Sequence, residues 1–156
     1  MLGEYAEAQS LLQECLALCR ELGHRHIAAH ALASLGGVAG ALGADRAAWQ
    51  HTHEALRTAR EIGSLSAMLF GLVSAAALLA RQAEPERAAE LAALVFHHAA
   101  TNRETKDRAK LLLAQLEAQI PGPILNAARE RGRARKLEEM AEQVLEWGQS
   151  LESSAN

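Results

Sequence analysis

Glycines recur along this chain at a fixed spacing of 40 residues. Gly23 ends the segment ALCRELG, Gly63 ends the segment TAREIG, and both glycines follow long amphipathic stretches. Gly3 and Gly43, each preceded by leucine, keep the same spacing. A glycine after an amphipathic stretch is typical of a helix C-terminus, where it adopts the left-handed conformation. Two sets of markers with one period predict an internal repeat built from helices.

The composition also favours helices over strands. Prolines occur only at positions 85, 121 and 123, and the chain is 49% apolar but only 3% aromatic. Alanine and leucine dominate and suit closely packed helices, whereas strands draw on β-branched and aromatic residues. At 156 residues the chain is long enough to bury the core of one domain. We therefore predict an all-α fold with helices at 4–22, 24–42, 45–62, 65–82, 86–100, 104–118, 122–131 and 137–150.

The second repeat, LASLGGVAGALGADRAAWQHTHEAL, indicates how each unit packs. Gly36, Gly37 and Gly40 each cost about 1 kcal/mol relative to alanine inside a helix, which indicates a close approach of a neighbouring helix there. Gly43 turns the chain. In the helix that follows this turn, small residues such as Ala48 lie on one face.

The flanking units keep parts of this pattern. The third unit follows at an offset of 41, and Glu84 takes the place of the turn glycine in it. Pro85 comes next, and proline suits the first turn of the following helix. The first unit keeps only the second half, from Gly3 onward. A capping box formed by Thr101 and Glu104 is expected at the start of the sixth helix.

This pattern resembles the tetratricopeptide repeat over residues 1–100, in the long-helix variety found in bacterial regulators. The resemblance implies a solenoid of helix hairpins. In such repeats the first helix of each pair lines a concave groove, which suits an apolar helix or peptide. The alternative is that the chain's own C-terminal helices cover this groove. The positions that the resemblance assigns to the groove are His30, Ala33, Ser34, Gly37, Gly71, Ser74, Leu78 and Arg81.

Residues 101–156 are expected to form a short helical cap within the same domain. The stretch from Arg87 to Trp147 resembles the C-terminal helical end of bacterial signal-transduction ATPase regulators of the LuxR, SARP and cyclase-linked types. The residues that carry this resemblance are Arg87-Ala88-Ala89, Arg108, the Leu111–Leu116 run, Ile124 to Ala128, Glu130-Arg131-Gly132-Arg133, Leu137-Glu138-Glu139 and Ala141. It implies a cytoplasmic sensor or scaffold module that binds a protein or peptide and has no catalysis or cofactor of its own.

One segment is strongly basic. It is the candidate for contact with phosphate or an acidic partner, while the alternative is a solvated turn whose cations pair with nearby glutamates. The net charge of −3 gives no general attraction to nucleic acid, so we expect a protein partner and keep nucleic-acid contact through this cluster as an alternative. The cluster comprises Arg129, Arg131, Arg133, Arg135 and Lys136.

The histidines and cysteines are the remaining reactive side chains. His26 and His30 share a helix face, but a zinc site needs three or four converging ligands. A histidine-based metal enzyme therefore stays an alternative, and we predict neither a metal nor an enzyme. Cys15 and Cys19 are expected to pack as buried thiols, with a redox or ligand pair as the alternative.

Two features bear on the surroundings of the chain. Residues 62–80 carry no charge but contain several glycines and serines, so they predict a buried helix rather than a membrane span. The helix at 4–22 presents an apolar face without a hairpin partner. We expect a second copy of the chain, or residues preceding Met1, to cover that face.

Overall fold

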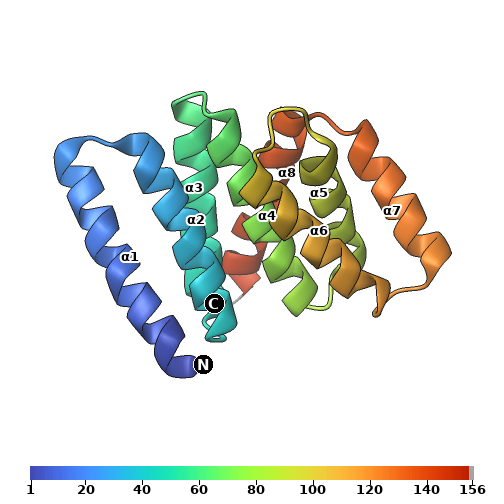
Figure 1. The fold of residues 1–156 in the computed structure, drawn as a ribbon, viewed down its shortest axis with the longest axis horizontal. Helices are drawn as coiled ribbons and strands as arrows, with labels where there is room; N and C mark the ends of the chain where they lie inside the picture. The colour runs from blue at the N-terminus through green and yellow to red at the C-terminus, as the bar shows by residue number, and fades with distance from the viewer. Residues whose placement is uncertain (155–156) are drawn as a thin grey trace.

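The chain is all-α, as predicted. The structure, a computed structural model, describes residues 1–154, with only the backbone described at Gly148 and at 150–154, and it contains no strand within that range. Figure 1 shows α1 and α7 at opposite ends of the molecule. The helices are α1 (Leu2–Leu22), α2 (Arg25–Ala41), α3 (Asp45–Glu61), α4 (Leu65–Arg81), α5 (Pro85–His97), α6 (Arg103–Glu117), α7 (Gly122–Ala134) and α8 (Leu137–Ser154).

Left-handed turn residues end the first four helices at a regular spacing. Gly23, Gly43 and Gly63 have φ values of 72°, 77° and 66°, and Ala83 follows in the same conformation at 59°. These four residues are 20 apart, so two helices make one unit of 40. The turn of the third unit is therefore Ala83 rather than the expected Glu84, and Gly3 lies inside α1 rather than in a turn.

Other helix ends differ from the predicted ones for local reasons. α5 ends at His97 rather than at residue 100, because His98 is extended and the Thr101 hydroxyl donates to the Val95 carbonyl at 2.6 Å. The expected capping box at Thr101 is wrong. Instead, the Asn102 side chain caps α6 by accepting from the Thr105 amide at 2.9 Å.

Helices α1 to α6 each pack on the next helix along the chain, with additional contacts between alternate helices. α2 packs on α4, α4 packs on α6, and α5 packs on α7 (Figure 1). α8 runs back along the array and packs on α3 and α4. One hydrophobic core extends from Ala29 to Val144, so the C-terminal helices and the repeats bury their apolar faces together.

Glycine permits close packing at two positions of α2. A Cβ on Gly36 would collide with the Thr52 side chain of α3, and one on Gly40 would lie 2.5 Å from a Leu78 methyl of α4. The predicted close approach is therefore confirmed at both. It is wrong at Gly37, where nothing lies within 4 Å and the backbone is exposed.

A second, smaller core attaches α1 to the rest of the molecule. Leu16 and Cys19 of α1 are each 6% exposed and pack with buried residues of α2, α3 and α4. The Sγ atoms of Cys15 and Cys19 are 4.0 Å apart, and both residues are thiols. Burial, followed by the interaction with Cys15, raises the pKa of the Cys19 thiol. The packing of Cys19 as a buried apolar residue is thus confirmed, whereas Cys15 is only half-buried at the margin of this core.

Candidate functional site

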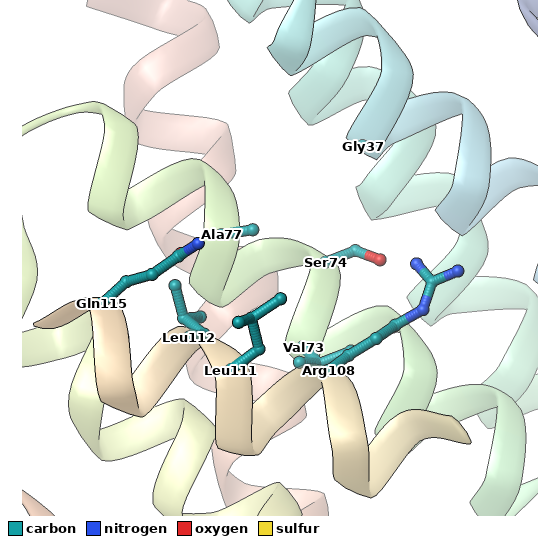
Figure 2. A pocket seen from close by; sticks show the side chains of 8 residues that line it. All are labelled: Gly37, Val73, Ser74, Ala77, Arg108, Leu111, Leu112 and Gln115. Carbon is teal, nitrogen blue, oxygen red and sulfur yellow. The ribbon is translucent and has the colours of Figure 1, made fainter.

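An open, mostly apolar pocket lies where α2, α4 and α6 meet. Its volume is about 200 Å³, and Figure 2 shows leucines of α6 facing small residues of α4 across it. All three helices contribute, so the pocket exists only because alternate helices lie side by side. The lining residues are Gly37, Val73, Ser74, Ala77, Arg108, Leu111, Leu112 and Gln115.

Small side chains on α2 and α4 keep this pocket open. Gly37 contributes only backbone, and Ala77 projects a single methyl group. The Ser74 hydroxyl donates to the Phe70 carbonyl one turn earlier at 3.1 Å, so its hydrogen is already used. On α6, Leu112 is buried, whereas Leu111 remains 62% exposed. The apolar surface is therefore accessible to a partner side chain.

Two polar side chains of α6 border the pocket. The Arg108 side chain runs along one side of it and Gln115 lies at the other end (Figure 2). The Arg108 guanidinium donates to Glu104 at 3.1 Å and lies 4.8 Å from the centre of the Phe70 ring. A cation over an aromatic face is held by the ring quadrupole. Arg108 is thus positioned as a donor at the edge of an apolar site.

Only part of the predicted groove reaches this pocket. Gly37 and Ser74 line it, while His30 and Ser34 of α2 are half-buried and do not line it. Arg81 is exposed and reaches from α4 to the Ala41 carbonyl of α2 at 3.5 Å.

The structure instead buries three of the predicted groove residues. Ala33 is 0% exposed and Leu78 is 1% exposed, with Leu78 packed against Gly40. Gly71 is buried beside Leu56 of α3. These three residues are inaccessible to a partner because they serve helix packing: Leu78 lies against Gly40, Gly71 makes room for Leu56, and Ala33 lies in the small core. The sequence-based assignment also missed all four residues of α6 that line the pocket.

A row of rings connects α2 to α4 next to this site. His30 lies between His26 and Phe70, with ring centroids 4.9 and 5.1 Å away. The Ser64 hydroxyl is 3.0 Å from Nδ1 of His26. Burial, and then the nearby His26, lowers the pKa of His30, against the opposing effect of Glu104. This arrangement favours the neutral form of His30 and packs its ring against two other rings.

The other histidines are dispersed. His53 is 4% exposed and meets the Trp49 ring edge-on, whereas the pKa of His51 is lowered mainly by burial. Burial also lowers the pKa of His97, which lies beside Phe96. Within the described part of the chain, no group of three or more His, Cys, Asp or Glu side chains is placed to hold a metal ion.

The predicted basic cluster is fully engaged in ion pairs. Glu90, whose side chain is only 10% exposed, accepts from Nε of both Arg131 and Arg135, at 3.2 and 3.1 Å. Most of the partner carboxylates lie on α5 and α6 rather than next to the cluster in sequence. These ion pairs therefore hold α7 against α5 and α6. The further pairs are Arg129–Glu117 at 2.8 Å, Arg131–Glu86 at 3.8 Å, Arg133–Glu130 at 3.6 Å and Lys136–Glu139 at 3.7 Å.

The apolar run of residues 62–80 forms most of α4, whose side chains fill the core. Among the helices that the structure describes, none combines the length and the apolar character needed to cross a bilayer. Comparisons of the chain with protein-family models, with curated proteins and with solved structures gave no match.

Proposed function

We propose that this chain is a protein-binding module, the sensor or scaffold part of a bacterial cytoplasmic regulator, with no catalysis of its own. The observation that supports this most directly is the open apolar pocket at α2, α4 and α6, with Leu111 62% exposed beside it. The resemblance to repeat-containing regulators supports the wider role. In that role, a conformational change on partner binding would be transmitted to a nucleotide-binding or DNA-binding module of the regulator.

The dimensions of the pocket favour one anchoring side chain over a whole small ligand. Drug-sized molecules occupy pockets of roughly 300–1,000 Å³, whereas this pocket holds about 200 Å³. An aliphatic or aromatic side chain on a partner helix would contact Leu111 and Ala77. Full burial of a leucine contributes about 1.5–3 kcal/mol. Arg108 and Gln115 would then donate to carbonyl or carboxylate oxygens of the partner backbone.

The basic cluster favours a structural role over contact with nucleic acid. Each of its five cations already has a carboxylate partner within 4 Å. A phosphate would have to displace those carboxylates and separate Arg131 and Arg135 from the nearly buried Glu90. The proposal therefore assigns partner binding to the pocket and assigns the cluster to the attachment of α7.

The proposal can be tested by selecting partners directly. A displayed library of amphipathic helical peptides would be selected on the wild-type chain, and the affinity of single peptides measured by fluorescence anisotropy. Leu111→Glu should weaken the selected peptides at least tenfold, because it places a charge on the apolar surface. Leu65→Glu is the control, since Leu65 is 45% exposed and lies outside this pocket. The proposal is overturned if every selected peptide binds both variants equally well.

A further inference from the structure

The outer face of α1 carries an unpartnered row of leucines. Leu11, Leu18 and Leu22 are 60%, 57% and 67% exposed. With the half-buried Cys15 they occur at steps of four, three and four residues, which is the spacing of a helix-packing seam. Half of the ten exposed large hydrophobic residues in the described part of the chain lie on α1. We call Leu11, Cys15, Leu18 and Leu22 the α1 seam.

The leucines of this seam are separate from the face that α1 uses to join the fold, whereas Cys15 lies at the border and packs partly against the small core. Leu12, Leu16 and Cys19 point into the small core, where α1 packs on α2. Each residue advances about 100° around the axis of an α-helix, because one turn takes 3.6 residues. The seam leucines therefore project in a different direction from Leu12, Leu16 and Cys19. α1 lies at one end of the molecule (Figure 1), so its outer side borders no other described helix. A second helix could pack there without disturbing α2.

An acidic edge runs along the seam on the side away from α2. Glu7, Glu14 and Glu21 are exposed and seven residues apart, so they form a line parallel to the leucines. The basic residue of this helix, Arg20, is paired with Glu54 of α3 at 2.6 Å. The edge therefore presents three carboxylates to whatever occupies the seam. In packed helix pairs, charges at such flanking positions determine partner choice.

This charge pattern disfavours a second copy of α1 as the occupant. Two α1 helices packed antiparallel through their seams would place the glutamate edges opposite each other, and like charges across such an interface are destabilising. Lysine or arginine on the occupant would instead find complementary carboxylates. We propose that the α1 seam docks an amphipathic helix of a partner protein, with a leucine-rich seam edged by lysine or arginine. This extends the proposed protein-binding function to a second surface, independent of the pocket.

Two synthetic helical peptides of 21 residues provide the probe. They share one leucine seam and differ only in their flanking residues, which are lysine in one and glutamate in the other. Like charges keep each peptide from pairing with itself. Anisotropy titrations use the full chain and its Leu111→Glu variant, in which the pocket beside Arg108 no longer offers the glutamate peptide an apolar site. In this variant the lysine peptide should bind at least tenfold more tightly than the glutamate peptide. This preference should weaken as salt is raised, because exposed charges are screened.

Variants of α1 then locate the binding. Leu18→Glu should reduce binding of the lysine peptide at least tenfold. The double variant Glu14→Lys, Glu21→Lys should reverse the preference and favour the glutamate peptide. Leu65→Glu is the matched control, since Leu65 of α4 is 45% exposed and lies outside both α1 and the pocket, and it should leave peptide binding unchanged. All four positions are exposed, so these variants should fold, which circular dichroism checks.

Several outcomes would overturn the inference. Equal binding of both peptides, or no reversal in the double variant, would show that charge does not select the occupant. Light scattering that shows a wild-type dimer converted to a monomer by Leu18→Glu would place a second copy on the seam. Amide exchange that shows the seam already protected in a monomer would place another segment of the same chain there. Loss of binding in Leu111→Glu alone would assign the peptide to the pocket and leave the proposed function standing.

Discussion

Replacing Gly132 with alanine tests the close contact between α7 and α5. A Cβ at this position would collide with the Glu90 carbonyl oxygen, and it would lie 3.1 Å from the Glu90 carbonyl carbon and 3.0 Å from the Ala93 Cβ. The first two are backbone atoms, which cannot rotate out of the way as a side chain can. α7 must therefore shift away from α5, and this shift would disturb the ion pairs of Glu90 with Arg131 and Arg135.

The expected cost follows from two opposing effects. Inserting a methyl group into a packed interface destabilises a protein by about 1–3 kcal/mol. Alanine in place of glycine inside a helix recovers up to about 1 kcal/mol. Because the clash is with backbone atoms, the packing cost should lie in the upper part of its range, at about 2–3 kcal/mol. We therefore expect Gly132→Ala to lower the free energy of unfolding by about 1–2 kcal/mol. For a chain of this size that corresponds to a fall in melting temperature of about 2–8 °C.

Gly37→Ala is the matched control, because Gly37 is exposed in α2 and has nothing within 4 Å of an added Cβ. The same chemical change should there raise the unfolding free energy by about 0.5–1 kcal/mol. Urea titration followed by circular dichroism at 222 nm measures both variants. The reasoning is refuted if Gly132→Ala is as stable as the wild type, or if the two substitutions shift the midpoint in the same direction.

Three further predictions use the same unfolding assay. Glu90→Ala should cost about 1–3 kcal/mol, since it removes the carboxylate that Arg131 and Arg135 share and leaves Arg131 only its longer pair with Glu86, whereas Glu139→Ala, at an exposed pair, should cost under about 1 kcal/mol. Ala83→Gly should stabilise by about 1 kcal/mol by relieving an alanine with φ of 59°, and no gain would contradict this. Burial lowers the pKa of His30 below its ordinary 6.5, so the unfolded chain binds this proton first. Stability should therefore decline as pH falls from 7 to 5, and less steeply in His30→Gln; an unchanged slope in that variant would contradict the assignment.

Most helix positions could be predicted because their ends depend on local chemistry. Glycine at 23, 43 and 63 marks three turns directly, and each glycine adopts the expected left-handed conformation. The fourth turn has an alanine, Ala83, in place of a glycine, so the sequence does not identify it. Its conformation is fixed by the hydrogen bonds around it, including the one from the Glu84 amide to the Leu79 carbonyl at 2.9 Å. The sequence therefore placed that turn one residue too late.

The candidate pocket was less predictable because it depends on tertiary packing. The repeat pattern identifies small residues on α2 and α4, but small residues serve both helix contact and open surface, as Gly40 and Gly37 show. The contribution of α6 had one visible signal, the run of three leucines at 111–113. Leu112 and Leu113 face the core, which forces Leu111 outward. Periodicity on α6 could thus have identified one lining residue.

The basic cluster also combines contacts that a local sequence pattern predicts with contacts that depend on tertiary packing. The alternative interpretation from sequence was pairing with neighbouring glutamates, and this occurs for Arg133 and Lys136. The pairs that hold α7 in place use Glu90 and Glu117 instead, which no local pattern connects to the cluster. Long-range pairing of this kind becomes visible only when the helices are placed in space.

The pocket and the α1 seam differ in the charge beside them, and this difference decides which of the proposed partners each would accept. The pocket is bordered by Arg108 and Gln115, which donate hydrogen bonds, whereas the α1 seam is edged by three carboxylates. A segment with lysine flanks suits the seam but would place cations beside Arg108. A segment with acidic flanks suits Arg108 but would oppose the glutamates of α1. One repeated partner segment therefore cannot satisfy both surfaces, so a partner that engages the whole array must present two chemically different helices or peptides.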